Sequence, residues 1–195
     1  MIYRAFKKAN DNFPEGGTCL EFGVYVGWSY MVQVNAILKD YPNTKLIGFD
    51  SWQGLPEETA DVWFPERHGK GKFTTSKDVV LKQLGDHADD LRFKLVDGFF
   101  KDSLTKELQD SIKDLIYVNV DVDIHSSTVE VLEFIRPLIR PGVIIYFDDW
   151  KDPQDKYLGK WGEHLAWGEF IEANPQVNYK TVEVNEYDQR YMEIL

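Results

Sequence analysis

The chain has 195 residues, of which 43% are hydrophobic and 14% aromatic, so it can bury a core without disulfides and is too apolar for a disordered chain. Its 33 acidic and 22 basic side chains give a formal net charge of −11, which disfavours nucleic acid and anionic membranes, because both are bound through clustered lysine and arginine. The single cysteine excludes an internal disulfide, and no apolar run approaches the roughly 18 residues of a membrane span. The start MIYRAFKKAN lacks the apolar core of a signal peptide. We therefore expect one cytoplasmic domain over residues 1–195.

Short apolar runs alternate with helix-like stretches from residue 18 onward. In chain order the pattern predicts a strand over 18–23, a helix over 28–40, a strand over 45–50, a helix over 76–85, a strand over 91–96, a helix over 104–112, a strand over 115–121, a helix over 127–139, a strand over 143–149, a helix over 157–173, and a hairpin of strands over 179–184 and 190–195. Nearly all-apolar strands separated by helices indicate a mostly parallel sheet with helices on both faces and the hairpin as an antiparallel edge. The predicted fold class is therefore α/β and Rossmann-like, with a seven-stranded sheet.

One connection is too long to be an ordinary loop. Residues 51–75 are polar and carry proline and glycine, which is typical of a lid or acceptor loop. His68 lies in this loop and is a candidate to reach an acceptor molecule. Trp52 and Trp63 lie in or beside this loop, and Trp28 follows a glycine-bearing turn. Aromatic side chains at these places are suited to wall an acceptor pocket.

A glycine-bearing turn follows the first predicted strand. Gly23 and Gly27 have the spacing GxxxG, which is neither the GxGxxG of dinucleotide folds nor a Walker A loop. Glu21 precedes the first glycine by two residues, so a phosphate is disfavoured and a cationic ligand is favoured. S-adenosylmethionine (SAM) carries both a sulfonium and an ammonium group. The alternative, a tight turn with glycines for packing, stays open at this point.

Acids also follow the second and third predicted strands. Asp50 ends the second strand, where a carboxylate can accept hydrogen bonds from both ribose hydroxyls of a nucleoside. Asp97, Gly98 and Phe99 follow the third strand and could frame an adenine ring, although a structural turn is an equal alternative. Together with the glycine turn, this pattern favours a nucleoside cofactor.

Four carboxylates close the fourth and fifth predicted strands. Asp121 and Asp123 end the fourth, and Asp148 and Asp149 end the fifth, so neighbouring parallel strands would bring three or four acids together. Carboxylates at such short separations repel and raise one another's pKa, and a bound cation relieves the repulsion. Oxygen ligands without histidine or cysteine suit a hard ion, Mg²⁺ first and then Mn²⁺ or Ca²⁺. The alternative is a set of helix caps and solvated loop acids.

Longer motifs now point to a family. LEFGVYVGWS resembles motif I of class I SAM-dependent methyltransferases and is close to the form in catechol O-methyltransferase. FDSWQGLPE, GKGKF, DVDIHSST and RPGVIIYFDDW together resemble the macrocin O-methyltransferase (TylF-type) family, in the same order. The resemblance covers residues 18–150 and implies a class I methyltransferase fold.

The resemblance also implies roles for individual residues. The methionine end of SAM would be held by Glu21, Gly23, Tyr25, Gly27 and Ser29. The ribose would be held by Asp50 with Ser51 beside it, and the adenine would lie near Asp97, Gly98 and Phe99. The metal ligands would be Asp121, Asp148 and Asp149.

The sequence also departs from these relatives. Ile124 stands where the catechol enzymes have a catalytic lysine, and His125 stands where the TylF-type pattern has tyrosine. The segment before the first strand is short, so the acceptor would be covered by residues 51–75, by the C-terminal half, or by a partner subunit of a homodimer.

These features predict a Mg²⁺-dependent SAM O-methyltransferase that acts on a hydroxyl of a small molecule. A sugar diol or a catechol would suit such a site, because vicinal oxygens can chelate the metal. The proton acceptor is open between Asp121, His125 and His68, and a helix-terminal residue without a role is an equal interpretation of His125. A methyltransferase without metal and a catalytically silent SAM-binding module remain alternatives. An NAD-type dehydrogenase is disfavoured by the absent GxGxxG.

Overall fold

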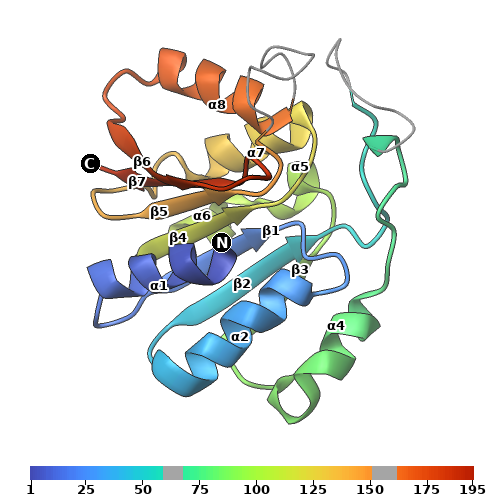
Figure 1. Cartoon of the computed structure of the whole chain (residues 1–195). Helices are drawn as coiled ribbons and strands as arrows, with labels where there is room; N and C mark the ends of the chain where they lie inside the picture. Colours follow the sequence, from blue (N-terminus) through green and yellow to red (C-terminus); the bar gives the residue numbers. More distant parts are fainter. Residues whose placement is uncertain (59–67, 151–161) are drawn as a thin grey trace.

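The computed structural model describes residues 1–58, 68–150 and 162–195 and is built around a seven-stranded sheet in the order β3-β2-β1-β4-β5-β7-β6 (Figure 1). The strands are β1 (Thr18–Phe22), β2 (Lys45–Asp50), β3 (Phe93–Asp97), β4 (Leu115–Val120), β5 (Ile144–Phe147), β6 (Tyr179–Val184) and β7 (Arg190–Ile194). Strands β1 to β5 pair in parallel, whereas β7 runs antiparallel to both β5 and β6. The predicted α/β fold and its antiparallel hairpin are confirmed.

Helices cover both faces of the sheet. They are α1 (Ile2–Asn12), α2 (Trp28–Asp40), α4 (Lys77–Leu84), α5 (Phe100–Ser103), α6 (Lys106–Ser111), α7 (His125–Ile135) and α8 (Gly162–Ala173), with the short 3₁₀ helix η1 (Gly85–His87) after α4. Helices α1 and α2 lie on one face, and α7 and α8 lie on the other (Figure 1). Among the described residues, no helix is both long and apolar enough to cross a membrane.

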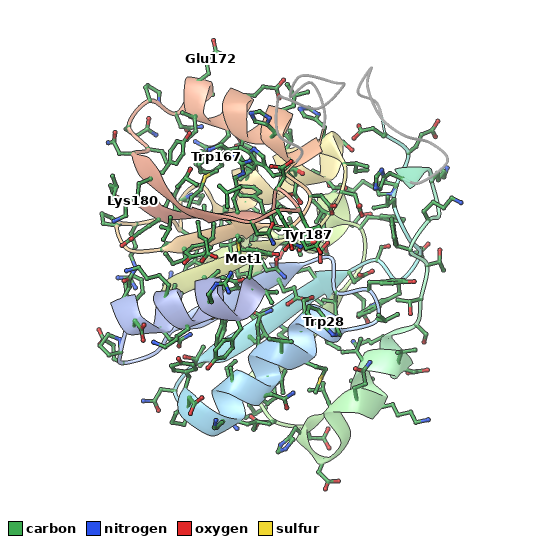
Figure 2. The ribbon with its side chains drawn as sticks, viewed as in Figure 1. Met1, Trp28, Trp167, Glu172, Lys180 and Tyr187 are labelled. Atoms are coloured by element: carbon green, nitrogen blue, oxygen red, sulfur yellow. The ribbon has the colours of Figure 1, made fainter. Side chains whose placement is uncertain are left out.

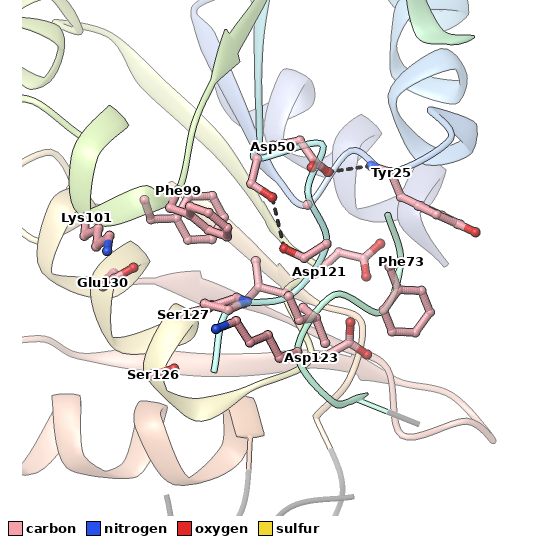
Figure 3. A pocket seen from close by; sticks show the side chains of 18 of the residues that line it. Tyr25, Asp50, Phe73, Phe99, Lys101, Asp121, Asp123, Ser126, Ser127 and Glu130 are labelled. Carbon is pink, nitrogen blue, oxygen red and sulfur yellow. Dashed lines mark hydrogen bonds between the residues drawn. The ribbon is translucent and has the colours of Figure 1, made fainter. Parts of the chain in front are cut away.

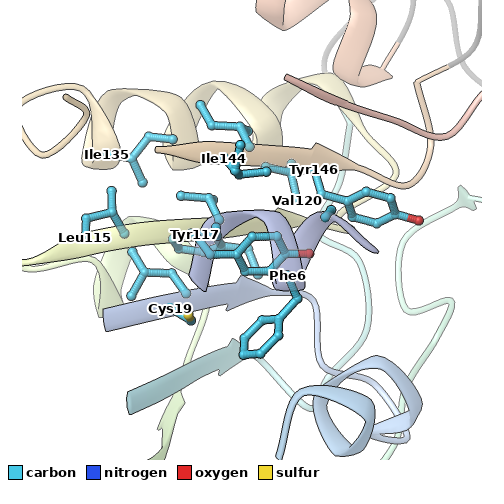
Figure 4. Packing of buried hydrophobic residues seen from close by; sticks show 14 of the residues in the cluster. Phe6, Cys19, Leu115, Tyr117, Val120, Ile135, Ile144 and Tyr146 are labelled. Carbon is cyan, nitrogen blue, oxygen red and sulfur yellow. The ribbon is translucent and has the colours of Figure 1, made fainter. Parts of the chain in front are cut away.

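The N-terminal helix α1 has no counterpart among the predicted elements. Its apolar residues Ile2, Ala5, Phe6 and Ala9 recur at helical spacing and are all buried. The ring of Phe6 meets that of Tyr117 edge to face, with 5.5 Å between the ring centroids (Figure 4). The residues before the first strand thus form a packed layer over the sheet.

Several predicted boundaries shift for local reasons. The predicted strand over 91–96 begins only at Phe93, because the Asp90 side chain accepts the backbone N–H of Arg92 at 2.9 Å and makes a turn. The predicted helix over 104–112 begins at Lys106, where Thr105 serves as the N-cap. Helix α7 begins two residues before the predicted start, at His125. Of the predicted helix over 157–173, residues 157–161 lie outside the described residues.

The central strands are buried along their whole length. Every residue of β1, β4 and β5 is buried, as expected for parallel strands covered on both faces. The rings of Phe22 and Phe49 stack with centroids 4.7 Å apart at the ends of β1 and β2. The polar residues that follow these strands therefore emerge together, at the carboxyl edge of the sheet.

Candidate functional site

A cavity of about 770 Å³ lies at this carboxyl edge, within the roughly 300–1,000 Å³ typical of ligand pockets (Figure 3). The loops after five parallel strands line it. Nine of the predicted site residues are among the lining residues: Gly23, Tyr25, Asp50, Ser51, Gly98, Phe99, Asp121, Asp148 and Asp149. The predicted cofactor and metal residues of different strands thus share one cavity.

The turn after β1 is shaped by the close approach of two backbone segments. Gly23 has a φ of 84°, and a Cβ atom there would lie 1.8 Å from the carbonyl oxygen of Asp121. Only glycine fits this position, both for its backbone angle and for its contact. The Gly23 N–H donates to the carbonyl of Phe49 at 3.0 Å, which ties the turn to the end of β2.

Gly23→Ala is expected to destabilise the fold by about 3 kcal/mol or more, because the positive φ alone costs about 1–2 kcal/mol and the overlap with the carbonyl of Asp121 forces the two strand ends apart. Urea unfolding measures this change. Gly71→Ala is the matched control: Gly71 has a similar φ of 78°, but a Cβ there meets nothing within 4 Å. Equal losses in the two variants would contradict the role of the close approach.

Asp50 is held rigidly at the end of β2. One carboxylate oxygen accepts the N–H of Tyr25 at 2.8 Å (Figure 3). The other accepts the N–H of Trp52 at 2.7 Å. Burial raises the pKa of this carboxyl above its ordinary value, and the backbone donors act against that rise. The carboxylate is thus fixed at the wall of the cavity, where it can accept a hydroxyl donor of a ligand.

Glu21 lies behind the turn and does not line the cavity. Its side chain is fully buried, and it accepts hydrogen bonds from the hydroxyl of Ser29 at 2.6 Å and from the amide of Gln33. Burial raises the pKa of Glu21 to about 8. In this arrangement Glu21 and Ser29 fasten α2 to β1. Gly27 is the left-handed N-cap of α2 and is not among the described residues that line the large cavity.

Asp97 points to the protein surface beside the cavity. It accepts hydrogen bonds from the indole N–H of Trp52 at 2.9 Å and from the Lys77 ammonium at 3.0 Å. The residues of its loop that line the cavity are Gly98 and Phe99. Asp97 therefore faces the surface, whereas Gly98 and Phe99 face the cavity.

Three carboxylates that line the cavity converge at the ends of β4 and β5. Asp121, Asp148 and Asp149 each offer an oxygen within 4.8 Å of the others. Burial, followed by the charges of Asp148 and Asp149, raises the pKa of Asp121 well above its ordinary value. Asp123 of the same loop has a φ of 60° and lines the cavity without joining this group.

Two residues that are not among those predicted from the sequence fix the orientation of Asp148. The hydroxyl of Tyr146 and the amide of Gln189 both donate to its Oδ1 atom, each at 2.6 Å. Tyr146 lies in β5, two residues before Asp148, so strand periodicity could have identified it. Gln189 comes from the hairpin, 41 residues away, and carries no local signal.

Glu163 is a further buried acid beside this group. It is fully buried near the start of α8 and accepts the backbone N–H of Asp149 at 3.0 Å. Gly162 lets the helix approach, since a Cβ there would lie 2.9 Å from the carbonyl oxygen of Asp123. The start of α8 is thus packed against the loops that carry the acids.

Neither candidate histidine is among the described residues that line the cavity. His68 is buried, with its Nε2 atom 3.1 Å from a carboxylate oxygen of Asp123. His125 points toward α8, where its Nε2 atom lies 2.7 Å from a carboxylate oxygen of Glu169. Both rings are engaged with acids that lie outside the group of three.

The described ends of the 51–75 loop cover one side of the cavity, whereas residues 59–67, including Trp63, lie outside the described residues. The backbones of Leu55 and Lys72 pair at 2.9 Å, which holds the two ends together. Leu55, Pro56, Glu57, Lys70 and Phe73 line the cavity. Glu58 is buried and accepts the N–H of Ser126 at the start of α7. The loop is thus anchored to the segment that follows Asp121.

The chain is similar to proteins that methylate small molecules. It is 27% identical over 161 residues to the 8-demethyl-8-(2,3-dimethoxy-α-L-rhamnosyl)-tetracenomycin-C 4′-O-methyltransferase of Streptomyces olivaceus, a match covering 75% of this chain and 59% of that protein. The chain therefore spans less than two thirds of this relative's length.

Solved structures share the fold at lower sequence identity. The O-methyltransferase NovP superimposes with a TM-score of 0.77 at 19% identity, covering 98% of this chain and 77% of that chain. CalS11, a calicheamicin methyltransferase, superimposes with a TM-score of 0.75 at 22% identity, covering 98% of this chain and 76% of that chain.

A family model described as "Methyltransferase domain" matches residues 20–150, which is more than half of the chain. The match begins in β1 and ends after Asp149, so it contains the glycine turn, Asp50 and the three carboxylates. The chain belongs to this methyltransferase domain family.

Proposed function

We propose that the protein is a Mg²⁺-dependent SAM O-methyltransferase that acts on a hydroxyl of a sugar-containing or other vicinal-diol small molecule. The observation that carries the proposal is that one cavity joins a nucleoside-type wall, built on β1 to β3, to a wall of three carboxylates after β4 and β5. The resemblance to TylF-type enzymes supports a sugar acceptor. So does the S. olivaceus relative, whose name places its reaction on a rhamnosyl compound.

The SAM molecule would be held by residues of the first three strand ends. The backbone of Gly23 and Tyr25 would contact the methionine end, Asp50 would accept the ribose hydroxyls, and Phe99 would pack on the adenine. Glu21 would act from behind, by fixing the start of α2 through Ser29 rather than by touching the ligand. Asp97 would likewise support the loop through Trp52 and Lys77.

The donor set of the second wall fits a hard divalent ion. Three carboxylate oxygens and no sulfur or imidazole ligand is the chemistry that Mg²⁺ prefers. Asp121, Asp148 and Asp149 would hold the ion, and Tyr146 and Gln189 would orient Asp148 toward it. When bound, Mg²⁺ would lower the pKa of an acceptor hydroxyl and fix its direction.

The chain's own residues would position the reactants and receive the proton. The 51–75 loop would exclude water from the cavity, which strengthens the electrostatic interactions inside. The acceptor oxygen would form a bond to the SAM methyl carbon as the bond from that carbon to sulfur breaks. The carboxylate of Asp121 is the candidate in the cavity to take the hydroxyl proton, since His68 and His125 face other acids.

The test combines binding with turnover. We expect SAM to raise the thermal unfolding midpoint, Mg²⁺ to raise it further, and labelled methyl groups to pass from SAM to a diol-bearing acceptor only when Mg²⁺ is present. Transfer that persists in EDTA would favour a metal-independent enzyme. SAM binding without transfer to any member of a diol panel would favour a silent binding module.

Asp50→Asn is expected to weaken SAM binding by about 10- to 100-fold, because hydrogen bonds to a charged acceptor contribute about 1.5–3 kcal/mol each and the amide offers only one acceptor oxygen. Isothermal titration calorimetry measures the affinity. Asp97→Asn is the matched control, since this acid faces the surface, and its SAM affinity should stay close to that of the original protein. An Asp97→Asn loss as large as that of Asp50→Asn would contradict the assignment.

A further inference from the structure

Glu163 is a carboxylate on the buried face of helix α8. Ala166, Trp167 and Phe170 share this face, and all four side chains are buried. Trp167, labelled in Figure 2, packs on Phe147 of β5 with 5.4 Å between the ring centroids. A glutamate on an apolar helix face costs free energy unless it is paired or hydrogen-bonded, so we expect a partner of Glu163 at the end of β5.

The two carboxylate oxygens of Glu163 have different surroundings. Oε2 accepts the backbone N–H of Asp149 at 3.0 Å. Oε1 is buried and has no hydrogen-bond partner among the described residues. No ion pair joins Glu163 to a lysine, arginine or histidine of the described ranges. Because buried carboxylate oxygens are almost always hydrogen-bonded, Oε1 is available to a donor that a ligand brings.

A helix-terminal acid is the simpler interpretation of Glu163. It lies in the first turn of α8, where the helix dipole stabilises a carboxylate. The hydrogen bond to Asp149, however, leaves the helix and crosses to the loop after β5. Gly162 brings the start of α8 against the neighbouring loop, since a Cβ there would lie 2.9 Å from the carbonyl oxygen of Asp123. Glu163 is therefore tied to the backbone of a candidate metal ligand.

The charges of the group of three, Asp121, Asp148 and Asp149, also act on Glu163. Burial, followed by the charges of these three aspartates, raises the pKa of Glu163 well above its ordinary value. Glu163 itself does not belong to the group whose oxygens lie within 4.8 Å of one another. A cation held by the group would be attracted by this fourth carboxylate without being ligated by it.

We propose that Glu163 is a positioning residue of the metal site, which fixes the backbone of Asp149 with one oxygen and accepts a hydrogen bond from a water ligand of the divalent ion with the other. This inference rests on the proposed function. Ions such as Mg²⁺ usually keep several water ligands, and the affinity of an oxygen site depends on its charge and rigidity. Partners of this kind typically change metal affinity by about 10- to 100-fold.

The test measures Mn²⁺ binding to the full chain by electron paramagnetic resonance, without SAM or acceptor. Glu163→Gln keeps the shape and one oxygen for the N–H of Asp149, but it removes the charge and replaces the second acceptor by a donor. Its dissociation constant for Mn²⁺ should be about 10- to 100-fold above that of the original protein. Glu169→Gln is the matched control, because Glu169 lies on the same helix and contacts His125 instead, and it should change the constant less than about twofold.

Urea unfolding without metal separates a role toward the ion from a role in the fold. Metal-free Glu163→Gln should be at least as stable as the original protein, because one of four mutually repelling acids is removed. Lower stability would assign Glu163 to the fold and overturn the proposal. A Mn²⁺ dissociation constant within about twofold of the original value would overturn it too, as would an equal loss in Glu169→Gln.

A double variant tests whether Glu163 acts through Asp149. Asp149→Asn alone should also weaken Mn²⁺ binding. In Asp149→Asn/Glu163→Gln the loss should be smaller than the product of the two single fold-changes, because residues in contact are not independent. A loss equal to that product would overturn the positioning role. Failure of the original protein to bind Mn²⁺ would instead contradict the metal ion of the proposed function.

Discussion

Asp121→Asn is expected to stabilise the metal-free protein by about 1–3 kcal/mol and to abolish its response to Mg²⁺. Without a cation, folding at neutral pH either buries the Asp121 charge beside Asp148 and Asp149 or takes up a proton, and both cost free energy. Asparagine keeps the shape and removes that cost. Methyl transfer should fall by about two to three orders of magnitude, since Lewis-acid stabilisation is worth several kcal/mol. Urea unfolding with and without Mg²⁺, together with initial rates, measures both effects.

Asp123→Asn provides the control for this variant. Asp123 lies two residues away and faces His68 rather than the group of three, so its replacement should leave the Mg²⁺-dependent stabilisation in place. If Asp121→Asn instead kept the full Mg²⁺ response, the proposed metal site would be wrong. If the metal-free variant were less stable than the original protein, like-charge repulsion would not be the dominant energy at this position.

Glu21→Gln is expected to flatten the pH dependence of stability between about pH 4.5 and pH 8. The pKa of Glu21 is about 8 in the folded protein, above the ordinary value of 4.5, so the folded state holds a proton that the unfolded state has lost. Stability therefore falls as pH rises through this window, by about 1.4 kcal/mol per unit and about 4–5 kcal/mol in all. The glutamine side chain of the variant cannot ionise. Relative to the original protein, the free energy of unfolding of the variant should therefore rise by about that amount between pH 4.5 and pH 8. Urea unfolding at a series of pH values measures it.

The surroundings of Glu21 can accommodate the amide. The side-chain oxygen of Gln33 has no hydrogen-bond partner among the described residues, so rotation of its amide group would let it accept from glutamine at position 21. Glu183→Gln serves as the control, because the pKa of Glu183 is shifted in the opposite direction to that of Glu21. The hydrogen bond from Arg4 lowers the pKa of Glu183, so any loss of stability in that variant should be present at pH values above the ordinary glutamate pKa and should disappear as the pH falls below it. Parallel stability curves for Glu21→Gln and the original protein would contradict the buried-proton account.

The strand ends of this protein could be predicted from the sequence because they depend on local pattern. Runs such as KLIGFD and VIIYFDD are apolar up to their final acids, and parallel strands place those acids on one edge. This was enough to bring Asp50, Asp121 and Asp148 to one cavity. The amphipathic spacing of Ile2, Phe6 and Ala9 is also local, and α1 could have been found by the same reasoning.

The contacts that select among the candidate residues are not local. Glu21 accepts hydrogen bonds from Ser29 and Gln33 and is buried away from the large cavity. These two residues reach Glu21 only because α2 packs on β1. His125 is drawn to Glu169 by the packing of α7 on α8, across 44 residues of sequence. Period and spacing identify which residues reach an edge, whereas the direction of each side chain is decided by tertiary packing.

The insertion of β7 between β5 and β6 also determines when the site can form. Residues 190–194 are translated after both neighbouring strands, yet they pair with β5 along residues 144–147. Gln189 reaches Asp148 only through that pairing, so the orientation of Asp148 depends on a contact of high sequence separation, the kind that forms late in folding. While residues 190–194 are still inside the ribosome, the pairing with β5 that brings Gln189 to Asp148 is absent. The orientation of Asp148 is therefore completed after the other strand ends of the site have been synthesised.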